Sequence, residues 1–188
     1  MKTKSILILF IALICGYSAY SQYSFDEIRY SENHSSETSK CYAIKKDTLV
    51  INHISNNELA INGYTYAAPE QDVVISTRVF YNAKLKTYIL LVDKTVDYSI
   101  GCDIILISNN KVQPIGEMAI SAYTKGDDGR MNYNSILPFV SIVKVSDRII
   151  FSFETPLVVI FPGLSEEATI NGRDIYYTYS KSTLQMFK

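Results

Sequence analysis

Two short apolar blocks, joined by a polar connection, constrain the fold of this chain more than any other feature. The blocks are Tyr88–Val92 and Ile104–Ile107, and Gly101 lies near the end of the connection. Each block is shorter than a typical helix of a globular protein, is rich in Ile and Leu, and is bounded by turn residues. We therefore predict two buried strands at the centre of a sheet.

The same succession of apolar segments and turn residues continues through residues 41–188. Asn62-Gly63 separates Leu59–Ile61 from Tyr64–Ala67, and Asn-Gly is the strongest short-range signal for a β-hairpin. Pro114 interrupts another segment, which predicts an edge strand or a bulge. The sequence therefore predicts a single all-β domain of about ten short strands, folded as an antiparallel sandwich or barrel.

Further strands are predicted wherever a short apolar segment lies between turn residues. They are Thr48–Ile54, Val73–Tyr81, Thr87–Val92, Val112–Ile115, Met118–Thr124, Phe139–Val145, Arg148–Phe153, Leu157–Phe161, Ala168–Ile170 and Asp174–Tyr179. The segments Ile54–Asn57 and Ile107–Asn110 resemble each other, which leaves a partial propeller as an alternative. Two hairpins with the same turn chemistry are the preferred explanation of this likeness.

Residues 1–21 have the pattern of a secretory signal peptide. Lys2 and Lys4 precede the apolar run Ile6–Ile14, and Ala19-Tyr20-Ser21 fits the small-x-small pattern of a cleavage site before Gln22. The run is shorter than the roughly 20 residues that span a bilayer. We therefore predict export to the periplasm, the cell surface or the medium, with no membrane span after cleavage.

A lipoprotein is the alternative to a cleaved soluble protein, because Cys15 lies in this leader. Lipoprotein signals carry a small residue before the acylated cysteine, and Ile14 occupies that position here.

Residues 22–40 are polar and rich in Ser, which predicts a flexible entry segment or a short helix at Phe25–Tyr30. Asn33-His34-Ser35 matches a glycosylation acceptor that only a eukaryotic secretory host would use.

Two cysteines remain after the leader, Cys41 and Cys102. In an oxidising compartment they predict one disulfide, which would close a loop of about 60 residues and stabilise the fold by roughly 4 kcal/mol. There is no CxxC motif, and no His lies within a few positions of either cysteine. These absences argue against a metal-binding or catalytic thiol.

Charge and composition argue against nucleic acid as the partner. The net charge of the whole chain is -1, and no Lys/Arg cluster is present, so the sequence lacks the basic footprint of a protein that binds nucleic acid. The chain has 15 Tyr and no Trp. Tyr at this density is typical of strands and of exposed binding faces.

Catalytic and metal-binding residues are sparse. A Ser-His-Asp arrangement would depend on His53, since His34 lies in the polar entry segment, and no Ser lies in a G-x-S-x-G motif. We predict no catalytic residues and no cofactor.

Four oxygen donors in the 125–134 loop form a weak candidate cation site. Their spacing departs from the EF-hand pattern, and the competing interpretation is a solvated hairpin loop. These donors are Asp127, Asp128, Asn132 and Asn134.

Tyrosines form the candidate binding set. Its members are Tyr64, Tyr66, Tyr176, Tyr177 and Tyr179. In a strand, Tyr177 and Tyr179 share a face with Ile175, while Tyr176 points the other way. An exposed Tyr face stacks on sugars or anchors a protein partner, and the alternative is that these rings line the core of the sheet.

We therefore expect an exported, non-enzymatic β domain that binds a protein or glycan partner. An inhibitor or immunity-type protein belongs to this class. One alternative is a secreted hydrolase of cell-wall or polysaccharide substrates, with its site near His53 or in the 125–134 loop. The other alternative is a structural or assembly component of the envelope, which would present a long unpaired edge strand.

Overall fold

The computed structural model describes residues 21–31, 39–44, 47–69, 72–126 and 129–188, so most of the predicted leader lies outside the described residues. The described chain is all-β, and it contains two 3-10 turns and no α-helix. It therefore contains no helix with the length and apolar character needed to cross a bilayer. Every pair of neighbouring strands is antiparallel, as the sequence predicted.

The strands and turns follow one another along the chain with short connections. They are β1 (Gln22–Ile28), β2 (Ser39–Ile44), β3 (Asp47–Ser55), β4 (Glu58–Ile61), β5 (Tyr64–Ala67), β6 (Val74–Asn82), β7 (Thr87–Thr95), β8 (Ser99–Ser108), β9 (Lys111–Met118), β10 (Ile120–Lys125), β11 (Met131–Asn134), η2 (Leu137–Phe139), β12 (Val140–Val145), β13 (Arg148–Phe153), β14 (Leu157–Ile160), β15 (Ala168–Asn171), η3 (Gly172–Asp174), β16 (Tyr176–Ser180) and β17 (Thr183–Phe187).

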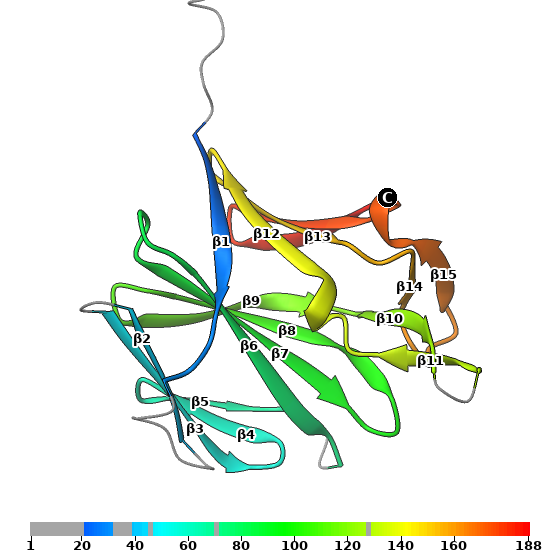
Figure 1. Cartoon of the computed structure of the whole chain (residues 1–188), viewed down its shortest axis with the longest axis horizontal. Coiled ribbons are helices and arrows are strands. Elements are labelled where there is room, and N and C mark those ends of the chain that lie inside the picture. Colours follow the sequence, from blue (N-terminus) through cyan, green and yellow to red (C-terminus); the bar gives the residue numbers. More distant parts are fainter. Residues whose placement is uncertain (1–20, 32–38, 45–46, 70–71, 127–128) are drawn as a thin grey trace, which may run out of the picture.

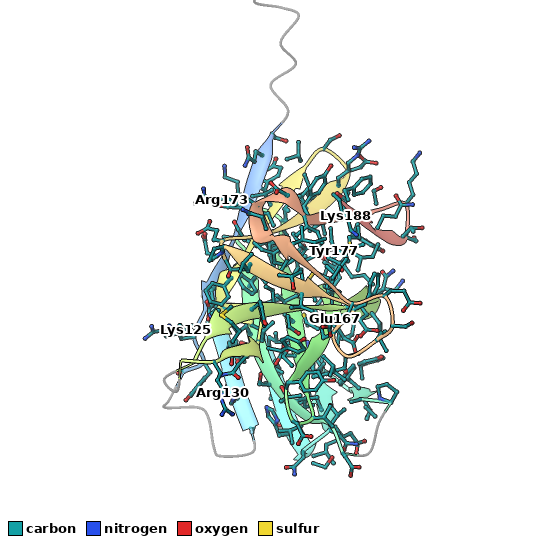
Figure 2. All side chains as sticks on the ribbon, turned by 90° about the vertical axis from the view of Figure 1, so that its right-hand side faces the viewer. Lys125, Arg130, Glu167, Arg173, Tyr177 and Lys188 are labelled. Atoms are coloured by element: carbon teal, nitrogen blue, oxygen red, sulfur yellow. The ribbon has the colours of Figure 1, made fainter. Side chains whose placement is uncertain are left out.

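Three antiparallel sheets make up the fold (Figure 1). The largest has nine strands in the order β17-β16-β13-β12-β1-β6-β7-β8-β9. Two four-stranded sheets accompany it, in the orders β11-β10-β14-β15 and β2-β3-β4-β5. Figure 2 shows the molecule from the side, with Arg173 and Tyr177 in its upper part and Arg130 in its lower part.

The nine-stranded sheet curls until its two edges meet, which makes it nearly a closed barrel. A Cβ atom at Gly116 on β9 would lie 3.0 Å from Leu184 on β17. On the neighbouring strand β16, the Tyr179 hydroxyl accepts a hydrogen bond from Gln113 Nε2 at 3.2 Å. Side-chain contacts thus connect β9, at one end of the strand order, with β16 and β17 at the other end. Glycine at position 116 permits β9 and β17 to approach closely.

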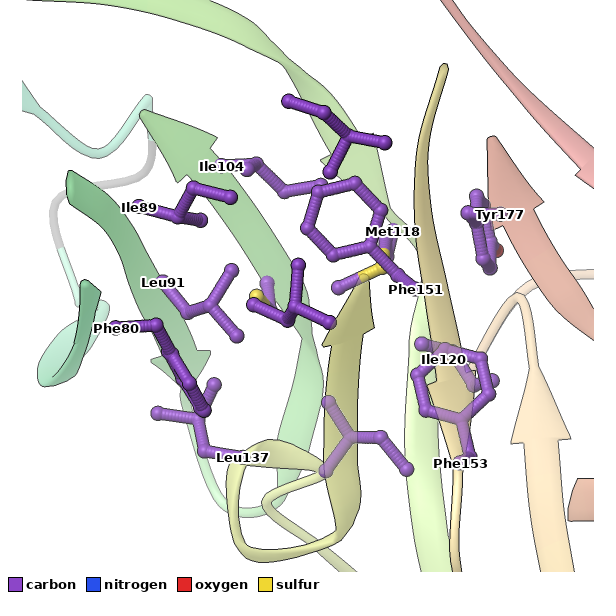
Figure 3. Close-up of a cluster of buried hydrophobic side chains, with 14 of the residues drawn as sticks. Phe80, Ile89, Leu91, Ile104, Met118, Ile120, Leu137, Phe151, Phe153 and Tyr177 are labelled. Carbon is purple, nitrogen blue, oxygen red and sulfur yellow. The ribbon is translucent and has the colours of Figure 1, made fainter. Parts of the chain in front are cut away.

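Apolar residues on the concave side of this sheet form the barrel core (Figure 3). Strands from distant parts of the sheet contribute large side chains to this core, such as Ile89 on β7, Ile104 on β8 and Phe151 on β13. None of these three side chains is exposed. The β11-β10-β14-β15 sheet adds Ile120 and Ile160 to the same cluster. The barrel core therefore joins the largest sheet and the β11-β10-β14-β15 sheet into a single packed unit.

A second core lies on the opposite side of β6, β7 and β8. The β2-β3-β4-β5 sheet covers this side with residues such as Leu49 and Ile61, which belong to one cluster with Leu90 and Ile105. Every residue of Thr87–Lys94 is buried because both faces of β7 are covered. The two predicted strands are therefore paired and buried, but they lie near the β9 end of the strand order and not at its centre.

The Asn62-Gly63 turn and the irregularity at Pro114 were also predicted correctly. Asn62 and Gly63 have positive φ values of 46° and 82° and connect β4 to β5. Pro114 lies on β9 beside a bulge, where the register with β8 shifts between Ile104 and Ile105. The Asn56-Asn57 and Asn109-Asn110 turns belong to hairpins of two different sheets, so their likeness reflects shared turn chemistry.

Strand β1 corrects one prediction from the sequence. The segment predicted to be flexible, or helical at Phe25–Tyr30, contains a strand that lies between β12 and β6 in the large sheet. Phe25 is 5% exposed and belongs to the barrel core, while the flanking Ser24 and Asp26 are exposed. This period of two, with few apolar residues, is too short to be distinguished in sequence from a polar linker.

The predicted disulfide is also wrong. Cys102 is fully buried in the barrel core, where burial raises the pKa of its thiol well above the usual value. Cys41 lies on β2 next to Tyr42, which points into the second core. Because neighbouring residues of a strand point to opposite faces, Cys41 points away from that core, and two sheets separate it from Cys102.

We therefore expect the protein to melt at the same temperature with and without dithiothreitol, as measured by circular dichroism. The Cys41→Ser variant is expected to melt like the wild type under both conditions. A disulfide between the two residues would contribute roughly 4 kcal/mol, so its reduction would lower the melting temperature by many degrees. Such a drop in the wild type alone would contradict the described arrangement.

Candidate functional site

The outward face of β13, β16 and β17 carries an open pocket of about 520 Å³. Strand alternation produces it: Ile149, Phe151 and Phe153 of β13 point into the barrel core, so Ile150 and Ser152 point outward. The pocket is lined by Arg148, Ile150, Ser152, Phe153, Gly172, Arg173, Ile175, Tyr176, Thr178 and Phe187. We call this the outer pocket.

An exposed pair of aromatic rings forms one end of the outer pocket. Tyr176 and Phe187 are opposite each other in the β16–β17 register. Their rings are stacked, with centroids 5.2 Å apart and planes at 10°, and the residues are 41% and 40% exposed. Stacking orders two large side chains that would otherwise be mobile at the surface. The pair thus presents a rigid apolar surface to a ligand.

The η3 turn places Arg173 beside this aromatic pair. Asn171 caps the turn by accepting a hydrogen bond at 2.9 Å from the backbone N–H of Arg173. Gly172 is buried against Thr155, and a Cβ atom at Gly172 would lie only 2.2 Å from the Thr155 carbonyl oxygen. Only glycine therefore permits this close approach. Arg173 also lines a neighbouring pocket of about 680 Å³, together with Glu154.

The structure separates the five tyrosines predicted as a binding set. Tyr176 is exposed at the outer pocket, whereas Tyr177 is buried in the barrel core, where burial raises its pKa. Tyr179 packs against that core from the same side, as alternation predicted. Tyr66 belongs to the second core and Tyr64 packs against it, half-buried. The Tyr66 hydroxyl donates to Asp103 Oδ2 at 2.6 Å.

Of the residues that line the outer pocket, only Tyr176 was among the predicted site residues, and three that matter for its chemistry were not predicted. Phe187 lies in a tail of the chain that follows the last hairpin turn, and Arg148 and Arg173 are isolated basic residues. Alternation along Arg148–Phe153 would have placed Arg148, Ile150 and Ser152 on one face. Nothing local in the sequence indicates that η3 brings Arg173 to the same place.

Only two of the four donors of the candidate cation site lie within the described residues. Asp127 and Asp128 lie outside them, and Asn132 and Asn134 lie on β11. The Asn134 side-chain amide donates to Thr124 Oγ1 at 2.6 Å, which joins β11 to β10. No group of three or more potential metal-ligating His, Cys, Asp or Glu side chains occurs within the ranges that the structure describes.

His53 is the one histidine whose surroundings the structure describes. His34 lies outside the described residues. His53 is half-buried on β3, and its Nε2 atom is buried without a hydrogen-bond partner there. Burial and the nearby charge of Lys40 lower the pKa of His53. Neither observation provides the nucleophile and base pair that a hydrolase requires.

A buried ion-pair network lies between the second core and the β8–β9 edge. Lys94 Nζ lies 2.6 Å from Glu117 Oε1 and 3.4 Å from Asp103 Oδ1, although its side chain is only 5% exposed. Burial lowers the pKa of Lys94, but the hydrogen bond and charge of Glu117 and the charge of Asp103 outweigh it, so the pKa is raised. The network therefore stabilises a charged lysine inside the fold.

A second buried polar group, Asp93, lies at one end of the barrel. It is 1% exposed, and its Oδ1 accepts a hydrogen bond from Ser99 Oγ at 2.8 Å. Burial raises the pKa of Asp93, and hydrogen bonds from Ser99, Ser135 and Thr95 oppose that rise. These hydroxyl groups satisfy the carboxyl group from within the protein, so it forms a structural contact.

A second aromatic cluster also holds elements of the fold together. The Tyr133 ring lies 5.3 Å from that of Tyr98 and 5.5 Å from that of Tyr123. The Tyr133 hydroxyl donates to Glu167 at 2.6 Å, which raises the pKa of Tyr133 to about 12. Glu167 also accepts from the Gly163 N–H at 2.6 Å. These bonds tie the β14–β15 loop to β11.

Comparisons with protein-family models, with curated proteins and with solved structures found no match for this chain.

Proposed function

We propose that this protein is an exported, non-enzymatic domain that binds a glycan in the outer pocket. The observation that carries the proposal is the exposed, stacked pair formed by Tyr176 and Phe187. A surface ring with little conformational freedom loses little entropy on binding, and its apolar face can stack on a sugar ring. Export follows from the signal-peptide pattern of the leader.

The rest of the pocket lining supports a saccharide ligand. Ser152 and Thr178 supply hydroxyl groups beside the aromatic pair, and Arg148 and Arg173 supply further donors. Ligand pockets combine an apolar surface with a few polar groups that fix orientation. Ser152 and Thr178 lie on paired strands together with the aromatic pair, so the sheet positions these groups before a ligand arrives.

The pocket lining gives little support to a hydrolase. Among the residues that line it in the described chain there is no Asp, Glu, His or Cys. Glycoside hydrolysis generally needs two carboxyl groups on opposite sides of the scissile bond. We therefore propose binding rather than cleavage at this site.

The edge strands give little support to assembly by strand addition. The outer strands of the two smaller described sheets are β5, β11 and β15, each of four residues, and β2, of six residues. Short edge strands offer few backbone groups to an incoming strand. The outer pocket is therefore a stronger basis for function than the sheet edges.

The Tyr176→Ala variant tests this proposal. We expect the wild-type protein to retain glycans on an array, and we expect the variant to bind them roughly thirtyfold more weakly, which corresponds to about 2 kcal/mol. Titration calorimetry with a retained glycan measures the loss, and circular dichroism shows that the variant is still folded.

Tyr30→Ala is the matched control, because Tyr30 is also exposed, at 45%, and lies on the segment after β1, outside the pocket lining. We expect this variant to bind like the wild type. The proposal is wrong if the wild type retains no glycan, or if the Tyr176→Ala variant binds as tightly as the wild type. If the wild type bound a protein partner and no glycan, the ligand would be a protein and the proposal would also be wrong.

A further inference from the structure

We infer that the glycan is acidic and that Arg148 and Arg173 bind its anionic groups. This inference rests on the proposed function and adds the chemical class of the ligand. The anionic group is a carboxylate, a sulfate or a phosphate, since the planar guanidinium group of Arg pairs with each of these through parallel hydrogen bonds.

The two arginines lie toward opposite ends of the outer pocket. Ile149 is opposite Tyr179, so Arg148 lies level with Ser180, four residues along β16 from Tyr176. Four residues of a strand span about 13 Å. Arg173 precedes Tyr176 and lies at the aromatic end. The arginines thus bracket a stretch long enough for more than one sugar ring, with the aromatic pair at one end.

Both guanidinium groups lack an ion pair with any described residue. The ion pairs of the described chain involve Arg78 and Lys94. Arg78, for comparison, lies 2.8 Å from Glu27. Arg148 and Arg173 are both exposed and line the pocket, so their side-chain N–H donors are oriented by neither a carboxylate nor burial.

The charge of the pocket differs from that of the whole chain. The protein as a whole has a net charge of -1, yet both charged residues that line the outer pocket are basic. Asp147 and Asp174 are sequence neighbours of the two arginines but do not line the pocket, and Glu154 lines the adjoining pocket instead. This local excess of positive charge favours an anionic ligand over a neutral one.

An array that carries uronic acid, sialylated, sulfated, phosphorylated and neutral glycans tests the inference with the purified protein. We expect the retained glycans to be anionic, and the acidic classes on the array identify which anionic group is bound. We expect Arg148→Gln and Arg173→Gln each to weaken binding of a retained glycan roughly tenfold or more in calorimetry. Added salt is expected to weaken binding to the wild type more than to either variant.

Arg130→Gln is the matched control, because Arg130 is exposed and lies far from Arg173 in the molecule (Figure 2). We expect it to bind like the wild type. Retention of neutral glycans, with loss in Tyr176→Ala and no loss in the arginine variants, would overturn the inference and leave the proposed function intact. Retention of no glycan would overturn both. Equal weakening in the Arg130 control would show non-specific attraction and would also overturn the inference.

Discussion

Replacing Phe151 with alanine is expected to lower the free energy of unfolding by about 3 to 5 kcal/mol. Phe151 is 0% exposed and lies in the barrel core opposite Ile142 and Tyr177 of the neighbouring strands. The variant loses the apolar surface that the ring buries, and it leaves a cavity among side chains from both halves of the sheet. Urea denaturation followed by circular dichroism measures the change.

Phe187→Ala provides the control for this prediction, because it is the same substitution at a residue that is 40% exposed. Only the stacking with Tyr176 and part of the apolar contact are lost, so we expect a loss of about 1 kcal/mol. Equal losses in the two variants would show that the core is not where the structure places it.

The double substitution Asp103→Asn and Glu117→Gln is expected to destabilise the protein by about 3 to 5 kcal/mol. It leaves the Lys94 ammonium group, whose side chain is 5% exposed, without either carboxylate. The Glu117 side chain is 47% exposed, so Glu117→Gln alone is expected to cost only about 1 kcal/mol. Urea denaturation at neutral pH measures both variants.

Adding Lys94→Met to the double variant is expected to restore most of the lost stability. The triple variant has no charged group left in this network, and replacing a buried ion pair by apolar residues is often close to neutral. The amide that Asp103→Asn introduces still offers an oxygen to the hydroxyl of Tyr66, which donates to the Asp103 carboxylate in the wild type. If the double variant were as stable as the wild type, Lys94 would not depend on these carboxylates.

The sequence predicted the two most buried strands and the Asn62-Gly63 turn well because their signals are local. Tyr88–Val92 and Ile104–Ile107 are apolar on both faces, and such runs occur where a strand is covered on both sides. Asn62-Gly63 adopts positive φ values that few other residue pairs tolerate. Each of these features depends on a few neighbouring residues.

The errors arose where partners distant in sequence decide the outcome. β1 has one buried residue, Phe25, and becomes a strand because β12 and β6 pair with it from both sides. Cys41 and Cys102 differ in location because each belongs to a different sheet. Neither fact follows from the residues that surround them in sequence.

The same reason limits prediction of the outer pocket. Period-two alternation correctly separates Tyr176 from Tyr177, so one exposed tyrosine could be predicted. The pocket also requires the β16–β17 register, which brings Phe187 beside Tyr176, and the η3 turn, which brings in Arg173. The register of two paired strands and the position of a short turn depend on the whole sheet.

The contact between β9 and β17 affects when the nearly closed barrel can form during folding. β17 is the last of the described strands to leave the ribosome, and β1, the first, lies in the middle of the large sheet. The sheet cannot curl shut until residues near both ends of the polypeptide are present together, and contacts over such long separations form slowly. The barrel therefore closes only after all of its strands, β17 included, have been made. Such late closure would also suit the export proposed above, because a chain crosses a narrow translocation channel unfolded.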